Sequence, residues 1–167
     1  MAKTALSSVL LLTIIIITTE AALPAGFNSV QDFVDAHNEA RTEVGVGPIA
    51  WNSSLAKSSS LLVRYQRDKM ECNFANLGSS RYGGNQLRSE GQVVSAREAV
   101  EAWVEEKQYY NHANNSCAKG RQCGTYTQVV WNKSVELGCA QTTCSQGVSL
   151  TICFYNPPGN VDGETPY

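Results

Sequence analysis

The chain has 167 residues, of which 13 are Lys or Arg and 15 are Asp or Glu, so its formal net charge is -2. This near-balance gives no electrostatic case for binding nucleic acid or an anionic membrane surface. The length is that of a single domain large enough to bury a hydrophobic core.

The first residues are typical of a secretory signal peptide. Lys3 supplies a positive charge, and residues 9–17 form an apolar run broken only by Thr13. A membrane span needs about 20 residues, so this run argues against the alternative, an uncleaved anchor. We place cleavage after Ala21, with Ala22 as the neighbouring alternative. The sequence thus predicts a signal peptide over 1–21, one secreted domain over 22–167 and no transmembrane segment.

All six cysteines lie after this signal, and an even number in a secreted chain is typical of a disulfide framework. One pair brackets a short loop, and another falls in apolar segments 135–141 and 148–154, which a hairpin would place opposite each other. The last two cysteines then pair with each other. The expected disulfides are Cys72–Cys144, Cys117–Cys123 and Cys139–Cys153. A zinc site is disfavoured, because the chain has two histidines and no C-x-x-C spacing.

Three N-x-[ST] sequons occur after the signal. They make Asn52, Asn114 and Asn132 candidates for N-glycosylation, provided that the side chains are exposed. Asn132 is the least favourable of them, because it directly follows an apolar run.

The first helix is expected over residues 29–44, with Ser29 as its N-cap and Gly45 ending it. Its buried face is expected to contain Phe33, His37, Ala40 and Val44. A histidine on such a face is either a core side chain hydrogen-bonded to its neighbours, which we favour, or a catalytic base.

A second helix is expected from Asn52 or Ser53 to about Met70. Its buried side is expected to contain Leu55, Leu62 and Tyr65. Residues 71–92 are rich in glycine and serine, and we interpret them as an ordered loop with one short strand near 85–87.

The capping box at residues 95–98 begins a third helix, expected over 95–110. Its apolar stripe is expected to contain Ala96, Ala99, Trp103 and Tyr110. Glu106 falls on that stripe, where a carboxylate needs a partner or takes up a proton. The favoured explanation is a structural bond to a tyrosine, backbone amides or an arginine, and a functional carboxylate is the alternative.

The last third of the chain is expected to hold a short helix centred on 127–131, then the hairpin. The tail from Asn156 has three prolines and two glycines, so it cannot form regular structure. Helices followed by a C-terminal hairpin indicate the α+β class.

Three motifs follow one another along this chain. Residues 37–41 read H-N-E-A-R, residues 124–131 read G-T-Y-T-Q-V-V-W, and residues 153–160 read C-F-Y-N-P-P-G-N. They are similar to H-N-x-x-R, G-H-Y-T-Q-V-V-W and C-N-Y-x-P-x-G-N of the plant group 1 pathogenesis-related proteins, in the CAP superfamily. The departures are Thr125 and Phe154.

The resemblance covers nearly the whole mature chain and is greatest to the pistil-expressed branch, on residues 109–112 and the Pro-Pro-Gly-Asn tail. It implies a three-layer α-β-α sandwich with a central antiparallel sheet and the three disulfides given above. It also implies a monomer secreted to the apoplast or cell wall.

Many family members carry a cavity tetrad of two histidines and two glutamates, which in some cases holds a divalent metal. The aligned positions here are Asn76, Gly84, Glu106 and Thr125, so one glutamate remains. Threonine and asparagine are poor zinc ligands, and one carboxylate cannot hold the ion alone. We therefore expect no metal and no cofactor. We assign no catalytic residue, because no histidine is left beside Glu106.

The resemblance implies a secreted, non-enzymatic defence protein that binds a sterol or another lipid. Family sterol binding is usually placed in the loop after the third helix, which here contains Tyr109 and Tyr110; packing of these tyrosines against the sheet is the alternative. The second function is a precursor from which cleavage before Pro157 releases a peptide ending at Tyr167. The prolines are expected to keep this tail extended and accessible, and a tail that packs across the domain is the alternative. An enzyme, metal-dependent or proteolytic, is the disfavoured third possibility.

Overall fold

A four-stranded sheet in the order β1-β5-β6-β2 is the centre of the computed structural model, which describes residues 30–167. The hairpin joins β5 (Glu136–Thr143) to β6 (Ser149–Asn156), and β2 (Gly83–Ser89) pairs antiparallel with the other edge of β6. The two-residue β1 (Ala50–Trp51) pairs parallel with β5. The predicted hairpin is confirmed, and the strand expected near 85–87 is longer at both ends. The predicted signal peptide and the Ser29 cap lie outside the described residues.

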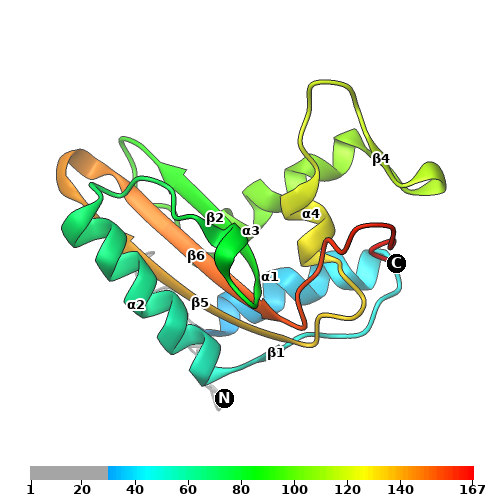
Figure 1. Ribbon diagram of the computed structural model, residues 1–167, viewed down its shortest axis with the longest axis horizontal. Coiled ribbons are helices and arrows are strands. Elements are labelled where there is room, and N and C mark those ends of the chain that lie inside the picture. The colour runs from blue at the N-terminus through cyan, green and yellow to red at the C-terminus, as the bar shows by residue number, and fades with distance from the viewer. Residues whose placement is uncertain (1–29) are drawn as a thin grey trace, which may run out of the picture.

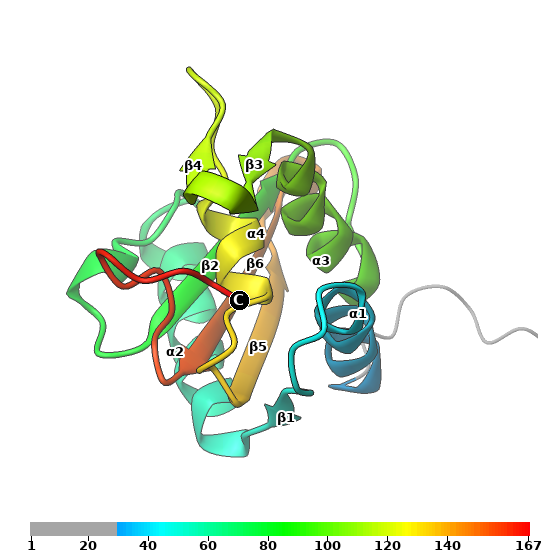
Figure 2. The same ribbon diagram turned by 90° about the vertical axis from the view of Figure 1, so that its right-hand side faces the viewer.

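Helices cover both faces of this sheet, which confirms the predicted α-β-α sandwich (Figure 1 and Figure 2). One face carries α2 (Ser53–Lys69), and the other carries α1 (Val30–Glu43), α3 (Ala96–Val104) and α4 (Gly124–Val129). A second, two-stranded sheet joins β3 (Tyr110–Asn111) to β4 (Ser116–Cys117). Short 3-10 turns lie at Leu77–Ser79, Glu105–Tyr109, His112–Asn114 and Ser145–Gly147.

The buried side of α2 differs from the prediction beyond Leu55. Tyr65 is 56% exposed, so its assignment to that side was wrong, whereas Leu62 is half-buried and packs against the core cluster that contains Val63. Ser59 is fully buried instead, and its hydroxyl donates to Gly138 O at 2.7 Å. A Cβ on Gly138 would lie 2.1 Å from the backbone nitrogen of Ala56. Helix and strand approach so closely at Gly138 that the small Ser59 lies at the contact, between the buried Leu55 and Val63.

The third helix ends earlier than predicted. The capping box forms, with Glu98 N donating to Ser95 Oγ and Ser95 N to Glu98 Oε2. The α-helix stops at Val104, and Tyr110 pairs with Cys117 across the small sheet. The pairing with β4 draws the chain away from helical geometry, which a local sequence pattern does not reveal. Helix α4 likewise ends at Val129, two residues before the predicted range ends.

The three disulfides join Cys72–Cys144, Cys117–Cys123 and Cys139–Cys153, as expected. The last pair lies directly across the hairpin, in the register that the spacing predicted. Within residues 30–167, the helices are too short or too polar to cross a bilayer.

Candidate functional site

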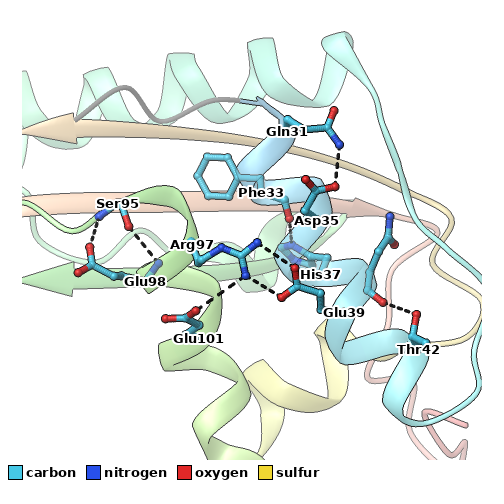
Figure 3. A network of polar contacts seen from close by, with 11 residues as sticks. Gln31, Phe33, Asp35, His37, Glu39, Thr42, Ser95, Arg97, Glu98 and Glu101 are labelled. Atoms are coloured by element: carbon cyan, nitrogen blue, oxygen red, sulfur yellow. Dashed lines mark hydrogen bonds and ion pairs between the residues drawn. The ribbon is translucent and has the colours of Figure 1, made fainter. Parts of the chain in front are cut away.

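His37 on α1 is fully buried and bonded through both ring nitrogens. Its Nδ1 lies 2.7 Å from the carbonyl oxygen of Phe33, which can only accept, so we assign the proton to Nδ1 (Figure 3). Its Nε2 then accepts from the hydroxyl of Tyr155 at 2.8 Å. Burial lowers the pKa of His37 to about 4, against the raising effect of the bond to Phe33, so the ring is neutral at pH 7. These contacts support a core histidine rather than a catalytic base.

Asn85 on β2 connects the hydrogen-bonded pair of His37 and Tyr155 to α4. Its Nδ2 donates to the hydroxyl of Tyr155 at 3.3 Å and to the carbonyl of Thr125 at 2.9 Å. Burial raises the pKa of Tyr155, so its hydroxyl stays protonated. A continuous set of hydrogen bonds therefore joins α1, β6, β2 and the first turn of α4.

Glu106 anchors the start of α4. Its Oε2 accepts from the backbone nitrogens of Thr125 at 2.9 Å and Tyr126 at 3.3 Å. The N-cap residue, Cys123, makes no side-chain capping bond of its own, so the glutamate supplies an acceptor for the free N–H groups of the first turn. Of the partners expected for Glu106, the structure shows backbone amides.

The other two aligned tetrad positions lie around a leucine. Asn76 is exposed, and its Oδ1 accepts from Gly78 N at 3.1 Å. A Cβ on Gly84 would lie 2.9 Å from Cδ1 of Leu77, so Leu77 fills the space that a longer side chain on β2 would need. Glu106 and Thr125 are thus brought together, whereas Gly84 and Asn76 are both neighbours of Leu77.

These residues do not fit a bound divalent metal. Glu106 already accepts two amide hydrogens, and neither the Thr125 hydroxyl nor the Asn76 amide is a good zinc ligand. Residues 30–167 contain no group of three or more His, Cys, Asp or Glu side chains placed to hold a metal ion. The expectation that the protein works without metal remains a prediction.

Tyr110 belongs to an aromatic group, defined here as Tyr110, His112, Tyr126 and Tyr167, and Tyr109 precedes it in the chain. The guanidinium carbon of Arg121 lies 4.6 Å from the ring centroid of Tyr109. The ring of Tyr110 lies 5.8 Å from Tyr126 on α4 and 6.4 Å from the C-terminal Tyr167. Tyr110 thus packs against α4 and Tyr167, and it also borders the hydrophobic core cluster that contains Tyr155 of β6.

The asparagines of the three sequons differ in their exposure and in their hydrogen bonds within the fold. Asn52 is half-buried and caps α2, and its Nδ2 donates to Glu136 at 3.0 Å. Asn114 and Asn132 are exposed. The two exposed asparagines are therefore better placed than Asn52 to carry a glycan.

Arg41 is a structural residue that the sequence reasoning missed. It is 1% exposed and donates to four carbonyl oxygens at 2.8 to 3.1 Å. The acceptors are Gly47, Val129, Trp131 and Ser134. Burial lowers its pKa to about 10, so it keeps its charge at neutral pH. Its place at the end of the H-N-x-x-R motif was a usable signal.

A clamp of ion pairs joins α1 to α3 at the surface. Arg97 contacts both carboxylate oxygens of Glu39, at 2.6 and 2.9 Å, and lies 3.9 Å from Glu101 (Figure 3). A small cavity of about 130 Å³ lies beneath, lined in part by Ala40 and Val100. These ion pairs are solvated, so their contribution to stability is small.

The C-terminal segment, defined here as residues 157–167, is packed along the domain rather than free. Pro166 is buried and Tyr167 is half-buried, whereas Pro157 and Pro158 are exposed. The expectation that the whole segment is accessible is therefore wrong for its last residues.

Comparison with known proteins gives a consistent result. The family model described as the cysteine-rich secretory protein family (CAP) matches residues 34–155. STS14 protein of Solanum tuberosum is 63% identical over 140 residues, which cover 83% of this chain and 65% of that protein. Pathogenesis-related protein 1B of Nicotiana tabacum is 46% identical over 140 residues, which cover 84% of this chain and 82% of that protein. The chain thus spans less than two thirds of the STS14 protein.

Solved structures match in fold. BmVAL-1 aligns with a TM-score of 0.67 and 21% identity, covering 88% of this chain and 86% of that chain. The structure of NaASP2 with Zn²⁺ aligns with a TM-score of 0.66 and 21% identity, covering 87% of this chain and 90% of that chain. At this identity, the likeness shows the fold alone.

Proposed function

The chain belongs to the cysteine-rich secretory protein (CAP) family and is of the pathogenesis-related protein 1 type, and from this premise we propose that it is a secreted, non-enzymatic defence protein that binds a sterol or another lipid. The predicted signal peptide and the extracellular destination are part of this proposal. So are its action as a monomer and its place in the pistil-expressed branch.

The hydrogen bonding of Glu106 is the observation that supports a function without catalysis. The one glutamate left at the tetrad positions accepts two hydrogen bonds from the backbone of α4. General acid–base catalysis needs a group free to exchange a proton with a substrate, usually beside a second titratable group. Thr125 supplies no such group, and the neutral His37 is enclosed in the core.

The aromatic group is where we place the lipid. The cavity between α1 and α3, about 130 Å³, is smaller than the roughly 300 Å³ at which ligand pockets begin. A hollow of about 440 Å³ lies beside the aromatic group. It is lined by residues 132–133 and 163–167, which include Tyr167. Tyr110 packs against Tyr167, so the hollow and the tyrosine loop adjoin. Aromatic rings with polar tips suit an amphipathic ligand such as a sterol.

Binding of a radiolabelled sterol to the secreted, mature protein tests this proposal. We expect saturable binding that weakens at least tenfold in a Tyr109→Ala/Tyr110→Ala double variant. Tyr65→Ala is the matched control, because this tyrosine is 56% exposed on α2, on the opposite face of the sheet. Thermal melting of each variant shows whether it is folded. Absence of saturable binding, or equal loss in the Tyr65 variant, would contradict the proposal.

A second candidate function is that of a peptide precursor. Its motivation is the exposure of Pro157 and Pro158, directly after the end of β6, where the resemblance places a cleavage. Mass spectrometry of extracellular fluid would detect a peptide of residues 157–167. Recovery of intact C-termini only, under conditions that induce defence, would count against this function.

A further inference from the structure

The start of the C-terminal segment is hydrogen-bonded to the stretch that follows α4 and to α4 itself. The hydroxyl of Ser134 donates to Pro157 O at 2.8 Å. The backbone nitrogen of Gly159 donates to Oε1 of Gln128 at 3.0 Å. Both side chains are buried, and the amide of Gln128 also donates to the Ser134 hydroxyl at 3.1 Å. Gln128 and Ser134, the two side chains that bind the start of the segment, therefore also hold each other in place.

Asn160 adds a two-point contact with α4. Its Oδ1 accepts from the hydroxyl of Thr127 at 2.6 Å, and its Nδ2 donates to Gly124 O at 2.8 Å. The amide of Asn160 thus accepts and donates at once.

A second set of bonds holds the far end. Nδ2 of Asn115 donates to Glu164 O at 2.9 Å, and Nζ of Lys133 lies 2.7 Å from the carboxylate of Glu164. The backbone nitrogen of Asn132 donates to Pro166 O at 2.7 Å, and the ring of Pro166 is buried. Main-chain groups of the segment are thus recognised by the domain, as in peptide complexes.

The terminal residue is enclosed by aromatic side chains. Tyr167 stacks on the ring of His112, with centroids 4.3 Å apart and planes 12° apart. Its hydroxyl is 3.2 Å from that of Tyr126, and its ring meets Tyr110 edge-on at 6.4 Å. A tyrosine at this position is bound on several sides, which makes it the anchor of the far end.

Between the two anchors lies a short exposed turn. Val161, Asp162 and Gly163 are exposed, and Glu164 N donates to Val161 O at 3.0 Å to close the turn. Two binding sites joined by a short linker reinforce each other, because release of one leaves it at a high effective concentration near its partner.

We propose that the C-terminal segment stays bound to the domain as a non-covalent peptide ligand after the Asn156–Pro157 bond has been cut. The cut is a hydrolysis by an external endoprotease and water: the carbonyl carbon of Asn156 gains a hydroxyl and becomes a carboxylate, and the nitrogen of Pro157 takes up protons. The hydrogen bonds and ring contacts between the segment and the rest of the domain do not depend on that bond, so they can remain after it is cut. Cleavage and release are then separate events, and the surface formed by α4, residues 132–134, Tyr110 and His112 is a binding site for residues 157–167.

The test uses the whole mature chain with the recognition sequence of a site-specific protease inserted between Asn156 and Pro157. After complete cutting, verified on a denaturing gel, the sample passes through a gel-filtration column in native buffer. We expect the peptide to elute with the domain and to appear alone only after denaturation. Elution of most of the peptide in the low-mass fraction directly after cutting would overturn the proposal.

Matched variants of the same chain locate the anchors. Asn160→Ala and Tyr167→Ala are each expected to raise the dissociation rate of the cut peptide at least tenfold. Val161→Ala, in the exposed turn, is expected to leave it unchanged. Melting of the uncut variants controls for folding, and equal rates in all three variants would contradict the assignment of the anchors.

This inference rests on the proposed precursor function for its biological setting, but the two can fail separately. The engineered cut measures retention whether or not the natural cut takes place. If extracellular fluid holds no cleaved chain, the precursor function fails and retention is unaffected. If free peptide leaves the engineered protein at once, retention fails and the precursor function stands.

Discussion

Acid is expected to destabilise this protein through His37 well before its carboxylates titrate. The ring is fully buried, and burial lowers its pKa from about 6.5 in the unfolded chain to about 4 in the fold. The unfolded chain therefore binds more protons between these values, so stability is complete above about pH 6.5 and falls as the pH drops towards 4. The whole difference is about 3 kcal/mol, of which about 2 kcal/mol is lost between pH 7 and pH 5.

Urea unfolding followed by tryptophan fluorescence, with the disulfides intact, measures this loss. His37→Gln is the comparison, because glutamine can keep a polar contact with Phe33 O or the Tyr155 hydroxyl but does not titrate. We expect the variant to be less stable at pH 7 and to lose about 2 kcal/mol less than the wild type on going to pH 5.

Parallel loss of stability in the two proteins would refute this reasoning. If the variant does not fold, the histidine resonances of the wild type give the answer directly. A titration midpoint near 6.5 for His37 would show that this ring is not desolvated as its burial implies.

Two further predictions concern buried side chains, and a third concerns the tetrad positions. Tyr155→Phe removes the hydroxyl that joins His37 to Asn85, and we expect a loss of about 1–3 kcal/mol in urea unfolding. Arg41→Lys is expected to cost about 2–4 kcal/mol, because lysine cannot reach four carbonyls, while Arg64→Lys on the solvated side of α2 should cost under about 0.5 kcal/mol. Zinc titration followed by calorimetry should show no binding to the wild type and no change in melting with chelator. Saturable zinc binding by the wild type, or a rise in its melting temperature on adding zinc, would contradict our account of the tetrad.

The parts of the fold that local patterns determine were predictable. Residues 145–147 form a turn between two apolar segments, so the register that sets Cys139 opposite Cys153 follows from counting outward from the turn. The start of α3 was predictable for the same reason, since its capping box lies within four consecutive residues. In both places, the residues that decide the structure are close together in the sequence.

The wrong predictions concern features of the helices that depend on residues far away in the sequence. The buried line of α2 passes through Ser59 because Gly138, far away in β5, lets helix and strand approach closely. The end of α3 depends on pairing with β4 and on the Cys117–Cys123 bond. A helical pattern read from α2 or α3 alone contains neither piece of information.

At the candidate site, too, the sequence gives the residue types, whereas the structure gives their contacts. The sequence showed which tetrad groups were absent, but it left the role of Glu106 open between chemistry and structure. The structure adds that α4 begins without a side-chain cap of its own, and that Glu106 accepts from its first amides. The Cδ1 of Leu77 lies beside Gly84, so a longer side chain at this position requires Leu77 to move. Asn76, Gly84 and Thr125 all lack a zinc-binding group, so restoring one of them would not rebuild a metal site. The carboxylate that remains has a structural task independent of metal, and this explains how it can persist where its three companions are missing.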